Sequence, residues 1–99
     1  MVISDIKSLN KSITTVTFVE QPPHRSDKER WAVCMTIDSY EGTNELFIEY
    51  KVLHRVETTM RMWRSVDAAL KAIKPFFVKY PTLIIRPLNP PEKPHEIPK

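Results

Sequence analysis

The side chains best suited to acid–base or metal chemistry are scattered along this chain. Its three histidines, His24, His54 and His95, fall in a polar loop, a turn and the C-terminal tail, without metal-ligand spacing between any two. The single cysteine, Cys34, lies on the outer side of an alternating segment, where we expect a packed thiol rather than a reactive one. A catalytic histidine needs a nucleophile or carboxylate held beside it, and the pattern indicates no such arrangement. We therefore predict that the protein is not an enzyme and has no metal site and no cofactor.

The carboxylates give no stronger signal of catalysis. Glu45, Glu49 and Glu57 are expected on or near the outer face of a sheet, where two carboxylates can in principle share acid and base roles. Lys51 and Arg61 fall among them, so we interpret this face as a solvated surface of mixed charge.

Composition narrows the function classes further. One glycine among 99 residues excludes glycine-rich phosphate loops, dinucleotide-binding fingerprints and glycine-flanked nucleophile elbows. Fifteen Lys and Arg residues against twelve Asp and Glu give a net charge of +3, which favours an anionic partner only weakly. A single cysteine fits a reducing compartment, and no apolar run reaches the roughly 20 residues of a membrane span. The first ten residues also lack the pattern of a signal peptide, so we expect a cytoplasmic protein with no membrane partner.

The element that must organise the rest is a helix predicted over 66–77. Its apolar stripe at helical spacing consists of Val66, Ala69, Leu70, Ile73 and Phe77. Ser65 is a natural N-cap, because its hydroxyl can accept from an otherwise unpaired amide of the first turn. Pro75 lacks an amide hydrogen and crowds the preceding turn, so regular helix should end near it. One face of this helix must cover a sheet.

Four segments before the helix have the composition and period of strands. They are Ile13–Val19, Trp31–Ile37, Leu46–Leu53 and Val56–Met62. The first nine residues fit either a short helical turn or a further strand.

A fifth strand is predicted after the helix, over 82–88. Leu83, Ile84 and Ile85 follow one another there, which indicates a strand buried on both faces or tucked under the helix. A strand–helix–strand crossover makes it parallel to the fourth strand if both belong to one sheet.

The register of the third and fourth strands follows from their apolar faces. A three-residue turn at Leu53–Arg55 pairs Val52 with Val56 and Ile48 with Met60, which brings the two apolar sets together. A two-residue turn would place the two apolar sets on opposite faces of the sheet, so we predict the longer turn. The inward residues would then be Leu46, Ile48, Tyr50 and Val52 on one strand and Val56, Thr58, Met60 and Met62 on the other.

This register predicts a basic rim where the loop before the second strand and the turn after the third emerge together. The helix is expected to return towards the same end. The basic side chains of the rim would be Arg25, Lys28, Arg30, His54, Arg55, Lys74 and Lys79. Asp27 and Glu29 dilute the charge, and an ordinary solvated loop end is an equally good interpretation. The rim is the first candidate for binding nucleic acid, since phosphate contacts need Lys and Arg.

The outer sheet face is the second candidate. It is expected to carry Phe47, Arg61 and Trp63, the composition of a base-stacking platform. Alternatively this face is a dimer interface, is covered by the N-terminal segment, or loses Trp63 to packing beside the start of the helix. A short sheet also leaves edges to cover, so a homodimer is a further expectation.

The sequence thus predicts an α+β domain over 1–88: an antiparallel meander of about four strands, one covering helix and a closing strand. A flexible proline-rich tail over 89–99 should follow. We expect a small, non-catalytic accessory protein that binds nucleic acid through the basic rim or the outer face. The alternative is a protein–protein interaction module or inhibitor that uses the outer face, an edge strand or the tail.

Overall fold

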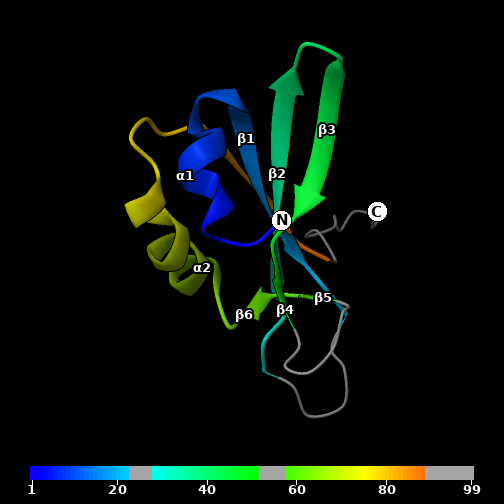
Figure 1. Cartoon of the computed structure of the whole chain (residues 1–99). Helices are drawn as coiled ribbons and strands as arrows, with labels where there is room; N and C mark the ends of the chain where they lie inside the picture. The colour runs from blue at the N-terminus through cyan, green and yellow to red at the C-terminus, as the bar shows by residue number, and fades with distance from the viewer. Residues whose placement is uncertain (23–27, 52–57, 89–99) are drawn as a thin grey trace, which may run out of the picture.

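The computed structural model of this chain describes residues 1–22, 28–51 and 58–88. In chain order its elements are α1 (Asp5–Leu9), the 3-10 helix η1 (Asn10–Ser12), β1 (Ile13–Glu20), β2 (Trp31–Ser39), β3 (Gly42–Phe47), β4 (Glu49–Lys51), β5 (Thr58–Met60), β6 (Met62–Trp63), α2 (Val66–Ile73), the 3-10 helix η2 (Lys74–Phe76) and β7 (Thr82–Arg86). The mixed α+β class with a mostly antiparallel sheet is confirmed (Figure 1). The predicted tail over 89–99 lies outside the described residues.

The main sheet is built on the antiparallel pair β1 and β2. Their register runs from Ile13 opposite Ile37 to Glu20 opposite Trp31, with an irregularity next to Ile13. β3 and β6 both pair antiparallel with β2, β3 with its second half and β6 with its start. β7 pairs in parallel with β1, so the sheet has the order β3–β2–β1–β7 with β6 beside β2. β6 and β7 run in the same direction, as the crossover predicts.

Both helices lie on the same side of this sheet (Figure 1). Ile6 of α1 and Ala69 and Ile73 of α2 are at most 1% exposed. The full buried cluster is Ile6, Ile13, Val16, Phe18, Val33, Met35, Ile37, Ile48, Trp63, Ala69 and Ile73. Of the two alternatives for the first residues, Asp5–Leu9 form the helical turn, while Val2 makes an isolated parallel bridge to Glu49. No helix in the described parts of the chain is long and apolar enough to span a membrane.

The start and end of α2 follow the sequence prediction. Ser65 is extended, and its Oγ accepts a hydrogen bond from the amide of Ala68 at 3.0 Å. Regular helix ends at Ile73, and the next turn is the 3-10 helix that contains Pro75. The predicted helix over 66–77 is thus an α-helix completed by a 3-10 turn.

The predicted third and fourth strands each divide in two. The break falls at Ile48 in the first case and at Arg61 in the second, so β3 and β6 join the main sheet while β4 and β5 form a separate pair. The amide of Ile48 donates to the carbonyl of Val33 at 3.0 Å, and its own carbonyl accepts from the amide of Arg61 at 2.9 Å. This fully buried residue therefore joins the two sheets.

The predicted register of these strands is wrong by one residue. Tyr50 pairs with Thr59, which is the register that a two-residue turn would continue, although the turn itself lies outside the described residues. Tyr50 and Met60, predicted to point inward, are 48% and 38% exposed. Ile48 is buried as predicted. Because the strand breaks there, the alternation of buried and exposed side chains does not continue from Ile48 into β4.

The predicted burial of the closing strand is also wrong. β7 lies at the edge of the main sheet, and Leu83, Ile84 and Ile85 are 46%, 41% and 58% exposed. The strand ends at Arg86, before Pro87, which cannot donate a backbone hydrogen bond. Its apolar residues therefore face solvent on both sides of the sheet.

Packing of α2 on the sheet makes a direct prediction. Ile73→Ala should lower the free energy of unfolding by about 2–5 kcal/mol, because it leaves a cavity in the core. Lys71→Ala, on the exposed side of the same helix, is the control and should change it by less than about 0.5 kcal/mol. Urea unfolding followed by circular dichroism measures both. Equal effects of the two substitutions would contradict the packing.

Candidate functional site

The described members of the predicted basic rim lie at two different ends of the main sheet. Lys28 and Arg30 precede β2, and the amide of Arg30 donates to the carbonyl of Trp63 at 3.0 Å. Since α2 follows Trp63 directly, the helix begins at this end and runs away from it. Lys79 lies at the other end, where it lines an open hollow with Ile13, the first residue of β1.

The expectation that Lys74 and Lys79 join Arg30 on one rim is therefore corrected. It assumed that the helix starts at the far end and returns, whereas the pairing of β6 with the start of β2 fixes its beginning beside Arg30. The other rim residues, Arg25, His54 and Arg55, lie outside the described residues, and their role stays a prediction.

Acidic side chains offset the charge at the Arg30 end. Arg30 Nη1 lies 3.8 Å from Glu20 Oε2, and the exposed Glu29 is its neighbour in the chain. Such a surface ion pair adds little stability, but it lowers the local positive potential that would attract a phosphate. The Lys28–Arg30 segment is therefore a weak candidate for binding an anion.

A second group of basic side chains gathers at the end where β1 begins. Lys11, Lys79 and Tyr80 line one open hollow of about 360 Å³. Tyr80 also lines a neighbouring groove with Lys74, whose Nζ lies 6.0 Å from the centroid of the Tyr80 ring. None of the described residues that line these two cavities is acidic. We call Lys11, Lys74, Lys79 and Tyr80 the lysine cluster.

Contacts between distant segments hold the lysine cluster together. The side-chain amide of Asn10 donates to the carbonyl of Phe76 at 3.3 Å, linking residues 66 positions apart. This bond fixes η1, which carries Lys11, beside η2, which carries Lys74. Sequence reasoning missed Lys11 because nothing near it in the chain indicates that η1 packs against the end of the helix.

The predicted interaction face is divided by the sheet. Trp63 is 9% exposed and pairs with Trp31 on the helix-covered side. Phe47 pairs with Cys34, which alternates onto the opposite side. Trp63 thus packs beside the start of α2, one of the alternatives considered for it, and it does not share a face with Phe47.

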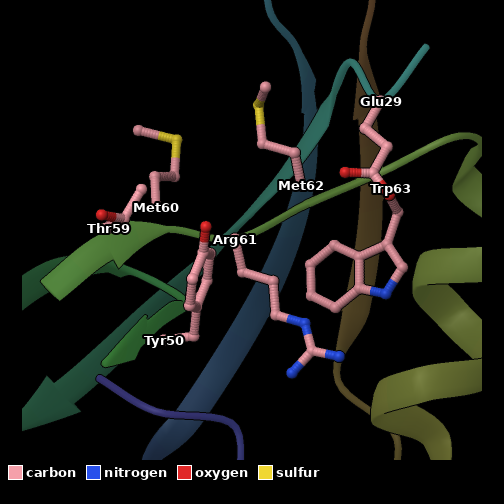
Figure 2. A pocket seen from close by; sticks show the side chains of 7 residues that line it. All are labelled: Glu29, Tyr50, Thr59, Met60, Arg61, Met62 and Trp63. Atoms are coloured by element: carbon pink, nitrogen blue, oxygen red, sulfur yellow. The ribbon is translucent and has the colours of Figure 1, made fainter. Parts of the chain in front are cut away.

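Arg61 remains close to Trp63, with its Cζ 5.2 Å from the ring centroid, within the range of a cation–π contact (Figure 2). Both line an open cavity of about 560 Å³. Its lining consists of Glu29, Tyr50, Thr59, Met60, Arg61, Met62 and Trp63. Because the Trp63 ring is almost fully buried, little of its face is free to stack on a base. The carboxylate of Glu29 further weakens this cavity as an anion site.

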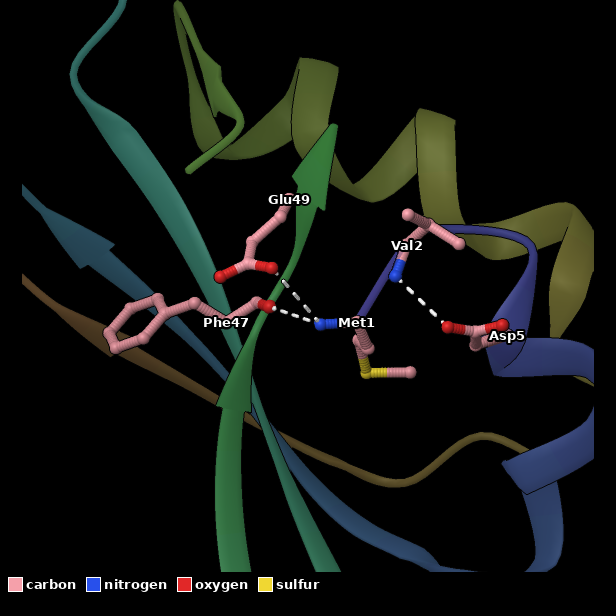
Figure 3. Close-up of polar contacts among 5 residues, drawn as sticks. All are labelled: Met1, Val2, Asp5, Phe47 and Glu49. Atoms are coloured by element: carbon pink, nitrogen blue, oxygen red, sulfur yellow. Dashed lines mark hydrogen bonds and ion pairs between the residues drawn. The ribbon is translucent and has the colours of Figure 1, made fainter. Parts of the chain in front are cut away.

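The N-terminal segment covers the sheet edge beside Phe47 rather than the Phe47 ring itself. The α-amino group of Met1 donates to the carbonyl of Phe47 at 3.1 Å and lies 3.7 Å from Glu49 Oε1 (Figure 3). The amide of Val2 donates to Asp5 Oδ2 at 3.0 Å. The N-terminal segment thereby bonds to part of the backbone where β3 meets β4.

Cys34 is a packed thiol, as predicted, and is 6% exposed. Burial raises the pKa of the Cys34 thiol, the nearby carboxylate of Glu45 raises it further, and Arg86 opposes them. The thiol is therefore neutral near pH 7 and a poor nucleophile. Within the described ranges, no three His, Cys, Asp or Glu side chains gather as metal ligands do.

The raised pKa of Cys34 predicts a pH dependence of stability. The folded state favours the neutral thiol, so this contribution is fully present below the usual thiol pKa of 9.0 and is lost as the pH rises through the higher folded pKa. Above that range the wild type should lose stability relative to Cys34→Ala, measured by urea unfolding. Labelling of the native thiol by a disulfide reagent at pH 7 should be at least about 100-fold slower than in urea. Equal labelling rates would contradict the burial.

The chain matches no protein-family model, no curated protein and no solved structure.

Proposed function

We propose that this protein is a small, non-catalytic accessory protein that binds single-stranded nucleic acid through the lysine cluster. The observation that supports this best is the grouping of three lysines around Tyr80, which is 59% exposed, in cavities without an acidic lining residue. A cytoplasmic location belongs to the same proposal.

The chemistry of the lysine cluster suits a flexible anionic strand. Ammonium groups contact successive phosphates without reading sequence, while an exposed aromatic ring offers a face on which a base can stack. A stacked base contributes about 1–3 kcal/mol and depends little on base identity. The arrangement therefore favours binding with little sequence preference.

The three lysines of the cluster set the expected strength of binding. Three phosphate contacts on a single strand give a slope of log affinity against log salt of about −2, since each contributes about −0.7. Binding should accordingly be detectable at low salt and weak near physiological salt.

Charge-matched substitutions test this site. Lys11→Ala and Lys79→Ala should each weaken binding to a labelled oligothymidylate several-fold and reduce the salt slope by about 0.7. Lys71→Ala removes the same charge from the exposed side of α2 and should leave both quantities nearly unchanged. Tyr80→Ala should weaken binding while preserving the slope, because it removes stacking alone. Fluorescence anisotropy across a salt series measures all four variants.

Two results would contradict the proposal. If Lys71→Ala matches Lys79→Ala, binding reflects net charge and not a site. If the wild type shows no binding at low salt, the nucleic-acid function fails. A protein-interaction module is then the better candidate, because β7 offers an exposed apolar edge.

A further inference from the structure

β7 is a short edge strand whose three central side chains are apolar and exposed. Its one neighbour in the main sheet is β1, and its other edge carries no strand among the described residues. The side chains of Leu83, Ile84 and Ile85 are all more than 40% exposed, although they form the most apolar run of the strand. An edge of this kind is a template for another strand, because its outward amides and carbonyls have no partner in the sheet.

The opposite edge of the sheet is protected in ways that β7 is not. β3 has the sequence GTNELF, with an exposed Glu45, and the α-amino group of Met1 donates to its last carbonyl, that of Phe47. β7 has the sequence TLIIR, with a single charge at its end. Polar and charged side chains are the devices that keep edges from pairing. The contrast identifies β7 as the edge suited to a partner.

The sequence around β7 is symmetric about Ile84. Pro81 and Pro87 flank the five residues of the strand, each three positions from Ile84. We propose that a second copy of this chain pairs with β7 in antiparallel orientation, with a two-fold axis through Ile84. The two five-stranded sheets then form one continuous sheet. This inference does not rest on the proposed nucleic-acid function.

The two-fold axis puts like side chains together. Ile84 lies opposite Ile84 of the second copy on the outer face, and Leu83 lies opposite Ile85 of the second copy on the helix-covered face. Cross-strand apolar pairs of this kind stabilise a sheet. A centre at Leu83 or at Ile85 would instead place a proline opposite a strand residue, where it cannot donate to the ladder. Ile84 is therefore the centre that uses every residue between the two prolines.

A groove beside β7 gives the partner strand an apolar surface to contact. It has a volume of about 140 Å³ and lies between α2, η2 and β7. Its lining is Leu70, Ile73, Lys74, Phe77, Tyr80, Pro81 and Leu83. A two-fold axis perpendicular to the sheet keeps the helix-covered faces of both copies on one side. Ile85 of the second copy, opposite Leu83, then lies next to this groove and extends the core across the seam.

Cysteine cross-linking tests both the contact and its register. In a Cys34→Ala background, Ile84→Cys should form a disulfide-linked dimer under mild oxidation, because residues opposite each other have Cα atoms about 4.5–5.5 Å apart, within the range that a disulfide spans. Leu83→Cys and Ile85→Cys should not, since each is diagonal to its own copy, beyond the range of a disulfide. Cross-linking at Leu83 or Ile85 but not at Ile84 would overturn the proposed register.

Association itself is measured on the protein without cysteine changes. The wild type should sediment as a dimer at high micromolar concentration. Ile84→Lys should weaken the dimer on the order of 100-fold, because two ammonium groups meet at the axis. Leu46→Lys is the control, because Leu46 lies on the β3 edge and is 41% exposed, as is Ile84. It should leave the affinity of the dimer unchanged. A wild-type monomer, or equal effects of both substitutions, would overturn the proposal. The groove beside β7 also contains Lys74 and Tyr80 of the lysine cluster. Sedimentation is measured without oligonucleotide, so it decides on the dimer whatever the oligonucleotide binding shows.

Discussion

The structure depends on how little sheet its two short helices can cover. The helices pack on the sheet through side chains that are almost completely buried: Ile6 of α1, and Ala69 and Ile73 of α2. Burial of a large aliphatic side chain contributes about 1.5–3 kcal/mol, so these contacts stabilise the fold strongly for their number. The area that the helices cover is centred on β2, because α2 lies against β2 and β6 and η1 lies against β2. β7 lies beyond it, which explains why an apolar strand is left exposed.

A second constraint is the limited length of β2. Its edge accepts β3 along one half and β6 at the start, so the strands that supply them must leave the main sheet between these positions. The breaks at Ile48 and Arg61 accomplish this, with Ile48 bonded to both Val33 and Arg61. The return through β6 places the start of α2 beside Arg30. It therefore also sets the lysine cluster at the far end of the molecule, where Lys74 and Lys79 meet Lys11.

The features that were predicted correctly from the sequence are local. Neighbouring residues determine the N-cap at Ser65 and the end of regular helix near Pro75. The strands β1 and β2 follow from the alternation of apolar and polar residues. The same alternation places Cys34 on the face opposite the helices, and it is buried there beside Phe47. These features need no knowledge of which strands become edges.

The features that were missed depend on distant contacts. The register of β4 and β5 was predicted wrongly because the strand breaks at Ile48, whereas the prediction assumed an unbroken alternation of apolar residues. An apolar run such as Leu83 to Ile85 is typical of a buried strand, yet its burial depends on whether a helix reaches it. The lysine cluster needed the contact from Asn10 to Phe76, which no periodicity reveals.

Amide hydrogen exchange tests most directly whether a second copy of the chain completes the exposed edge of β7. Alternate amides of Thr82–Arg86 point away from β1 and should exchange quickly in dilute protein. As concentration rises into the dimer range, they should become protected to the level of the amides that bond to β1, while the β3 edge stays unchanged. Fast exchange of these amides at every concentration would contradict the pairing of β7 with a second copy.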